Sequence, residues 1–212
     1  MKVLITAGPT EEHIDVIRFI TNKSSGKMGV ELAREAIKRK HKVVLICNPL
    51  RVNVPKGIKV RSIRTSDDII KVTLEELKSG YDIFISTAAI ADFKPKKFFK
   101  SKLSSSRKFI LELSPTKKLT MLVKKRFPKI FMVAFKAEYG VDEKTLCQRS
   151  RRKLRDENLD IIVANDIKKN FFGSNETEIS IIDKNGFIKR IPKCKKISAA
   201  REIWNYIETN FC

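Results

Sequence analysis

Histidine is scarce in this chain, and its cysteines are unpaired: two histidines and four cysteines occur in 212 residues. With only His13 and His41 available, the sequence argues against a histidine-ligated metal centre and against a serine–histidine triad. The cysteines contain no C-x-x-C pair, which argues against a zinc ribbon or a disulfide framework. Reduced thiols are therefore expected at Cys47, Cys147, Cys194 and Cys212.

Long apolar runs are also missing. No stretch approaches the ~20 residues that a membrane-spanning helix needs, and the chain starts with a strand-like segment rather than a signal-peptide core. The sequence predicts a cytoplasmic protein with no membrane partner. Its hydrophobic content of 42% suffices for a packed core, and its length suits one domain, residues 1–212.

Acidic residues are depleted in one segment. Residues 94–129 hold 13 of the 45 basic residues and only one of the 24 acidic ones, Glu112, while the whole chain carries a net charge of +21. A concentrated cationic stretch within a folded domain suits a phosphate-binding flap, which we place at residues 94–108. A solvated loop explains the charge equally well.

Strand-like and helix-like patterns alternate along the chain. Buried strands are expected at 2–7, 41–47, 58–63, 81–86, 109–113, 130–135 and 160–164. Helices are expected at 26–40, from a Ser66 cap, at 117–126, at 142–158 and from a Ser198 cap. Strands at 177–183 and 187–191 flank the turn residues Lys184, Asn185 and Gly186. The order predicts a doubly wound, mostly parallel, Rossmann-like α/β sheet with helices on both faces and a C-terminal antiparallel hairpin.

Ligands of such sheets bind beyond the carboxyl ends of the strands. Residues 7–10, 88–92, 135–138 and 164–166 occupy those ends and are mostly small or polar. The segment 22–29, Asn-Lys-Ser-Ser-Gly-Lys-Met-Gly, precedes the first helix, where backbone N–H groups attract anions. It matches neither the P-loop nor the G-x-G-x-x-G pattern, so the sequence favours a phosphate cradle of another kind, or a plain helix cap.

Four segments, in this order, resemble one family. They are Ile5 to Gly8 leading to Asp15, Arg18 to Asn22 joined to Ser24 to Gly29, Ala88 to Phe93, and Leu159-Asp160 to Asn165-Asp166. The family is phosphopantothenate–cysteine ligase, also called phosphopantothenoylcysteine synthetase, of coenzyme A biosynthesis. The resemblance spans nearly the whole chain and implies a stand-alone form without the flavin-dependent decarboxylase to which many bacterial members are fused. No flavin is expected.

The resemblance implies a two-step ligation. A nucleoside triphosphate, CTP or ATP, with Mg²⁺ would activate 4′-phosphopantothenate as an acyl-nucleotide and release pyrophosphate. The amine of L-cysteine would then displace the nucleotide. It also implies a homodimer.

The resemblance also assigns site residues. Catalytic roles are implied for Arg18, Asn22 and Lys100, with Lys100 on the triphosphate and Asn22 on the acyl-nucleotide. The nucleotide pocket would contain Gly8, Ala88, Ala89, Asp92, Lys100, Phe135 and Lys153, and phosphate or phosphopantothenate would be bound by Asn22, Ser24, Ser25, Gly26 and Gly29.

Three positions depart from the family pattern. Pro9 stands in a turn that is Gly-Gly-Thr in the family, Leu103 replaces the last lysine of the flap, and Glu157 replaces a second lysine found in many members. Pro9 removes a backbone donor near the pocket. These changes leave the choice between CTP and ATP open.

Two other functions compete with the ligase. A nucleic-acid-binding protein using residues 94–129 is suggested by Phe93, Phe98 and Phe99 among the lysines, and its affinity should fall steeply with salt. No recognised nucleic-acid module occurs, so nucleic acid is the less favoured partner. A nicotinamide- or flavin-dependent oxidoreductase is favoured least, and cofactor titration discriminates it.

Overall fold

The computed structural model describes residues 1–106 and 108–211, and its centre is an eight-stranded sheet in the order β12-β11-β10-β9-β6-β1-β4-β5. The sheet strands are β1 (Lys2–Ala7), β4 (Lys42–Cys47), β5 (Lys59–Ser62), β6 (Ile83–Ser86), β9 (Phe131–Glu138), β10 (Ile161–Asp166), β11 (Glu176–Asp183) and β12 (Ile188–Lys195). Five helices accompany them: α1 (Lys27–Lys38), α2 (Ser66–Leu77), α3 (Leu119–Arg126), α4 (Glu143–Asp156) and α5 (Lys196–Asn210).

Strands β5, β4, β1, β6, β9 and β10 pair in parallel, whereas β11 and β12 form an antiparallel hairpin beside β10. The chain proceeds from β1 outward to β5 and then returns past β1 to β6, so the strand order reverses between β1 and β6. This reversal is the topological switch point of a doubly wound sheet, beside which ligands bind. The predicted fold class, including the C-terminal hairpin, is confirmed.

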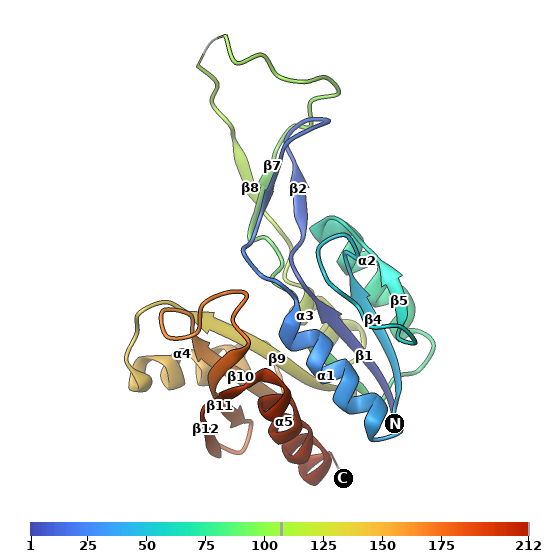
Figure 1. Ribbon diagram of the computed structural model, residues 1–212, viewed down its shortest axis with the longest axis vertical. Helices are drawn as coiled ribbons and strands as arrows, with labels where there is room; N and C mark the ends of the chain where they lie inside the picture. The colour runs from blue at the N-terminus through green and yellow to red at the C-terminus, as the bar shows by residue number, and fades with distance from the viewer. Residues whose placement is uncertain (107, 212) are drawn as a thin grey trace.

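Each face of the sheet is covered by helices because alternate strand residues point to opposite sides. Val3, Ile5 and Ala7 of β1 are buried on the side of α1 and α5. Leu4, between them, is buried on the side of α2, α3 and α4. Figure 1 shows α1 and α5 side by side, with both chain ends at the end of the molecule away from the projecting strands.

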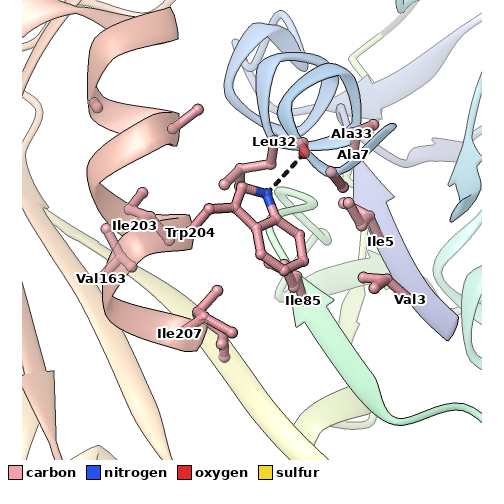
Figure 2. Close-up of a cluster of buried hydrophobic side chains, with 14 of the residues drawn as sticks. Val3, Ile5, Ala7, Leu32, Ala33, Ile85, Val163, Ile203, Trp204 and Ile207 are labelled. Carbon is pink, nitrogen blue, oxygen red and sulfur yellow. Dashed lines mark hydrogen bonds between the residues drawn. The ribbon is translucent and has the colours of Figure 1, made fainter. Parts of the chain in front are cut away.

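Trp204 attaches the C-terminal helix to the first one. Its fully buried ring lies among side chains of α1, α5 and the sheet, and its Nε1–H donates to the carbonyl oxygen of Leu32 at 2.9 Å (Figure 2). The indole thus combines a large apolar contact with a satisfied donor, which is how tryptophan is accommodated in a core. This contact fastens α5, which follows β12 directly, to α1.

Four short strands form a projecting arm, defined here as the described residues of 11–21 and 93–115. They are β2 (Glu11–His13), β3 (Phe19–Thr21), β7 (Phe93–Pro95) and β8 (Leu113–Pro115), and β2, β7 and β8 rise together in Figure 1. The arm begins where β1 and β6 end, at the carboxyl edge of the sheet. It contains the predicted flap 94–108, of which residue 107 lies outside the described chain.

Asp15 fastens the two halves of the arm. Its buried carboxylate accepts from the Arg18 guanidinium, from the backbone N–H groups of Ile17 and Arg18, and from Leu103 N–H at 3.1 Å. The Arg18 hydrogen bonds, followed by the backbone donors, hold the pKa of Asp15 well below its usual range despite burial. Leu103, one of the departures from the family pattern, therefore contributes its backbone to the arm.

Several local predictions were wrong. Thr65, not Ser66, caps α2: its hydroxyl accepts from Asp68 N–H, while the Asp68 carboxylate accepts from Thr65 N–H, a reciprocal capping box. Lys195, not Ser198, is the N-cap of α5.

The predicted strand at 109–113 is also absent except for Leu113, which opens β8. Phe109 and Ile110 are 48% and 78% exposed, so that segment has no sheet to pack against. Strands β2, β3 and β7 were not predicted, because three-residue ribbons carry almost no periodic signal.

The thiols of Cys47, Cys147 and Cys194 are free, as predicted, whereas Cys212 lies outside the described residues. Within those residues no helix combines the length and apolarity needed to cross a membrane.

Trp204→Phe should lower the free energy of unfolding by about 2 kcal/mol, because the smaller ring leaves a void and removes the donor to Leu32. Urea unfolding followed by circular dichroism measures this, since the substitution removes the one tryptophan of the chain. Thr209→Ala, at an exposed site on the same helix, should change stability by no more than ~0.5 kcal/mol. Equal stabilities for wild type and Trp204→Phe would show that the indole does not fasten α5.

Candidate functional site

A cavity of about 560 Å³ lies at the carboxyl edge of the sheet, between the start of α1, the loop after β6 and the ends of β9 and β10. It is where the reversal of strand order predicts a ligand. Most predicted site residues line it: Asn22, Ser24, Ser25, Gly26, Gly29, Ala88, Ala89, Asp92, Phe135 and Lys153. The fold therefore brings the cradle and the predicted nucleotide-pocket segments together.

Three predicted site residues do not line this cavity. Gly8 is buried beside it, where its carbonyl oxygen accepts from Ala89 N–H at 2.9 Å, so it supports the loop that does line the cavity. Arg18 lies on the arm and bonds to Asp15 and to the Leu103 carbonyl oxygen. Lys100 is exposed on the arm.

The start of α1 supplies unpaired backbone donors to the cavity. Gly26, the N-cap, has a left-handed conformation (φ 71°) and no side chain with which to cap the helix. The first N–H groups of a helix have no acceptor within it, so those of Lys27, Met28 and Gly29 remain for a ligand. Ser24 Oγ is near the same turn, 3.4 Å from the N–H of Gly26.

Gly29 permits α1 to approach the sheet closely. A Cβ atom on this residue would lie 2.5 Å from both Ala7 Cβ and Thr87 Oγ1. No real Cβ contact is that short, so any side chain would push the helix away from β1. The glycine predicted to hold phosphate therefore sets the distance between the helix N-terminus and the strand ends.

Helix caps are distributed unequally in this fold. The helices that begin at the cavity, α1, α3 and α5, have no side-chain cap and no acidic residue in the first turn. Helices α2 and α4 begin elsewhere and are capped by Thr65 and Asp142, with acidic residues in their first turns. A helix N-terminus carries partial positive charge, which a cap or an anion offsets. The three ends without side-chain caps leave positive partial charge at the cavity, although the first N–H of α5, that of Lys196, donates to the Asn175 carbonyl oxygen at 2.8 Å.

Threonine hydroxyls fix the loop after β6. Thr87 Oγ1 donates to the Thr6 carbonyl oxygen at 2.6 Å, and Thr10 Oγ1 accepts from Ala91 N–H at 3.0 Å. Asn22 Nδ2 donates to the Ala89 carbonyl oxygen at 2.9 Å. The Asn22 carboxamide thus lies on this loop rather than at the helix entry, with one N–H and its oxygen left for a ligand.

The lining of the cavity is strongly cationic. Five lysines contribute to it, against one acidic residue, Asp92: they are Lys27, Lys117, Lys118, Lys153 and Lys196. Lys118 pairs with Asp92 at 2.5 Å. Burial, and then the nearby charge of Lys27, lower the pKa of Lys196. Such a lining favours an anionic ligand with more than one charge.

Glu157 modifies this charge. Its carboxylate accepts from Lys153 Nζ and from Thr120 Oγ1, each at 2.5 Å, and both of those side chains line the cavity. Glu157, which departs from the family pattern, therefore offsets the charge of Lys153 and orients the Thr120 hydroxyl at the cavity wall.

Several lining residues were not predicted. They are Lys27, Lys117, Lys118, Thr120, Lys196 and the loop Asn170 to Gly173. Lys27 stood within the recognised cradle and could have been found there. Lys196 could not have been found from the sequence, because α5 was expected to begin at a Ser198 cap.

The described residues contain no group of three histidine, cysteine, aspartate or glutamate side chains that could hold a metal ion. The lining offers Asp92 alone, already paired with Lys118. The side chains present do not form a magnesium site of their own, and Mg²⁺ fits here only as a complex with ligand phosphates. No histidine or cysteine lines the cavity within the described chain, whereas lysine side chains and helix N-termini, which stabilise negative charge, do.

Comparisons with known proteins identify the family and the relatives of this chain. Residues 1–211 match the family described as DNA/pantothenate metabolism flavoprotein C-terminal domain. The chain is 38% identical over 209 residues to the coenzyme A biosynthesis bifunctional protein CoaBC of Thermococcus kodakarensis, covering 98% of this chain and 51% of that protein. It is 37% identical over 205 residues to the CoaBC of Bacillus subtilis, covering 95% and 49%. The chain thus spans about half the length of these relatives.

Several solved structures share the fold of this chain over nearly its whole length. The C-terminal domain of a CoaBC protein superposes with a TM-score of 0.81 at 30% identity, covering 98% of this chain and 94% of that one. The DNA/pantothenate metabolism flavoprotein from Streptococcus pneumoniae gives 0.87 at 26% identity, covering 99% of each chain. A Cab2 mutant in complex with phosphopantothenate-cysteine, at 16% identity and a TM-score of 0.73 over 98% of this chain and 88% of that one, shares the fold.

Gly29→Ala should destabilise the protein by about 1–3 kcal/mol, since the new methyl overlaps Ala7 and Thr87. Urea unfolding measures the loss. Arg34→Ala places alanine at an exposed position of the same helix and should cost no more than ~0.5 kcal/mol. An unchanged midpoint for Gly29→Ala would mean that α1 can retreat without cost and that its close approach to β1 is unimportant.

Proposed function

The chain belongs to the family of the DNA/pantothenate metabolism flavoprotein C-terminal domain, and on that premise we propose that it acts as a phosphopantothenate–cysteine ligase of coenzyme A biosynthesis. The observation that carries the proposal is the cationic cavity at which three helices begin without side-chain caps. Two polyanions, a triphosphate and a phosphorylated acid, must meet in such an enzyme. Their mutual repulsion requires the positive charge that the cavity provides.

The proposed reaction has two displacements. The carboxylate oxygen of 4′-phosphopantothenate attacks the α-phosphorus of the nucleoside triphosphate, and pyrophosphate leaves with the bonding electron pair. The amine of L-cysteine then attacks the acyl carbon, the nucleoside monophosphate leaves, and the amine loses a proton to solvent. Neither displacement needs a histidine or cysteine side chain, which accords with the composition of the lining.

Residues at different positions in the cavity would bind different parts of the substrates. The N–H groups at the start of α1, with Ser24 and Ser25, would bind phosphate. Ala88, Ala89, Asp92, Phe135 and Lys153 would hold the nucleotide, with Gly8 supporting the 88–92 loop. Asn22 would contact the acyl-nucleotide from its position on Ala89.

The co-substrate is proposed to be CTP or ATP, bound with Mg²⁺, and the reaction requires no flavin. The pairing of Lys153 with Glu157 affects the choice between CTP and ATP. Glu157 offsets the charge of Lys153 and orients the Thr120 hydroxyl, so this wall offers the nucleotide hydrogen-bonding groups rather than net charge. Turnover with each nucleotide measures the preference.

A homodimer is also proposed. The arm exposes large apolar side chains, including Ile17, Phe98 and Ile110, which a partner surface would cover. Arg18 and Lys100 lie on the arm, so their proposed roles require an arm, from this copy or its partner, to cover the cavity.

The charge pairing of the basic segment weighs against nucleic acid as the partner. Four of its lysines already pair with carboxylates: Lys94 with Asp67, Lys96 with Glu112, Lys118 with Asp92 and Lys124 with Asp160. These four pairs offset part of the local charge within the fold, leaving less for a phosphate backbone.

Incubation with 4′-phosphopantothenate, L-cysteine, Mg²⁺ and one nucleoside triphosphate at a time should yield pyrophosphate, the nucleoside monophosphate and phosphopantothenoylcysteine. Mass spectrometry and a pyrophosphate assay detect them, and omission of phosphopantothenate is the control. No pyrophosphate with any of the four nucleotides would refute the ligase, and a nucleoside diphosphate with inorganic phosphate would indicate acyl-phosphate chemistry instead.

Asn22→Asp should reduce turnover by at least ~100-fold while leaving triphosphate affinity within about threefold of wild type. The substitution replaces the donor to the Ala89 carbonyl oxygen with a negative charge, while the backbone donors at the start of α1 are unchanged. Rapid quench should show slow decay of the acyl-nucleotide in the presence of cysteine.

Asn53→Asp, at an exposed position outside the cavity lining, serves as the matched control and should behave as wild type. Equal losses of triphosphate affinity and turnover in Asn22→Asp would place Asn22 against the triphosphate instead. Near-normal turnover would reduce it to a structural contact.

A further inference from the structure

One end of the cavity is formed by the starts of α1 and α5. Lys27 and Lys196 are the first residues of these helices, and both side chains line the cavity. The Lys27 ammonium donates to two neutral acceptors, the Gly173 carbonyl oxygen at 2.6 Å and Asn175 Oδ1 at 2.9 Å. Among the residues described, neither lysine has a carboxylate partner, so two positive charges face the cavity without compensation.

Asn175 fixes the two helix starts relative to each other. Its side-chain oxygen accepts from Lys27 Nζ, and its backbone carbonyl oxygen accepts from the N–H of Lys196 at 2.8 Å. A single residue between β10 and β11 thus bonds to both helices. The spacing of the two lysines is set by this connection before any ligand arrives, as a preorganised site requires.

The environment of Lys196 disfavours its own charge. Burial, and then the charge of Lys27, lower the pKa of its ammonium group. Neither helix has a side-chain cap or an acidic residue in its first turn, and Thr177 and Ile179 close this part of the wall. A doubly charged anion between the lysines would offset both cations and both helix ends together.

We infer that Lys196, together with the Lys27 side chain, binds a phosphate group of a substrate at the α5 end of the cavity, as an anion subsite distinct from the Ser24 and Ser25 hydroxyls and the backbone N–H groups at the start of α1. The inference rests on the proposed function, in which both large substrates carry phosphate. The group is either the part of the triphosphate that leaves as pyrophosphate or the 4′-phosphate of phosphopantothenate. The two ligands can be titrated separately, so the sources are distinguishable.

Isothermal titration with pyrophosphate, with the nucleoside triphosphate and Mg²⁺, and with phosphopantothenate, each alone, tests the subsite without requiring turnover. Lys196→Gln and Lys27→Gln should weaken binding of at least one of these ligands by about tenfold or more, the scale of a lost charged hydrogen bond. Lys196→Arg should retain most of the affinity because it keeps the charge.

Lys195→Gln and Lys38→Gln are matched controls, since both are exposed lysines next to the site or on the same helix and neither lines the cavity. They should bind every ligand within about twofold of wild type. Thermal unfolding confirms that each variant is folded.

A loss confined to pyrophosphate and triphosphate assigns the subsite to the leaving group, and a loss confined to phosphopantothenate assigns it to the 4′-phosphate. Unchanged affinity for all three ligands in folded Lys196→Gln, or equal losses in the control variants, would overturn the inference. The proposed function fails separately: wild type that releases no pyrophosphate refutes the ligase, whereas active wild type with unaltered binding in Lys196→Gln refutes only the subsite.

Discussion

The close approach of α1 to β1 is the constraint on which the rest of the site depends. With no side chain at Gly29, the helix begins directly above the strand ends, and Gly26 ends the preceding turn without a cap. The unpaired N–H groups therefore point at the switch point of the sheet, where the 87–92 loop and Phe135 complete the wall. Backbone geometry therefore supplies hydrogen-bond donors at the cavity, and the lysine side chains add net charge.

The main architecture could be predicted because its signals are local. Runs such as Val43 to Ile46 are long enough to mark a buried strand, and the strand–helix alternation then fixes the parallel order. The cradle and the 88–92 segment could be placed at one edge for the same reason, since carboxyl ends of parallel strands share that edge. Ten of the predicted site residues line a common cavity as a result: Asn22, Ser24, Ser25, Gly26, Gly29, Ala88, Ala89, Asp92, Phe135 and Lys153.

The parts that could not be predicted depend on contacts between distant residues. The arm is stabilised by Asp15 bonding to Leu103, a pairing of residues 88 positions apart that no periodicity reveals. The positions of Lys196 and Glu157 depend on where α5 begins and α4 ends, and for α5 the sequence placed the N-cap three residues too late, at Ser198 instead of Lys195. Caps were also misassigned where two adjacent hydroxyl residues competed, as at Thr65 and Ser66.

The cavity joins the first and last thirds of the chain. Its walls include the start of α1 near the N-terminus and Thr177, Ile179 and Lys196 from the C-terminal hairpin and helix, linked through Asn175. A nascent chain that has not yet emerged past α5 thus lacks one wall, however well its earlier strands have paired. A ligand that contacts both Lys27 and Lys196 would therefore stabilise only molecules whose last helix has already packed through Trp204.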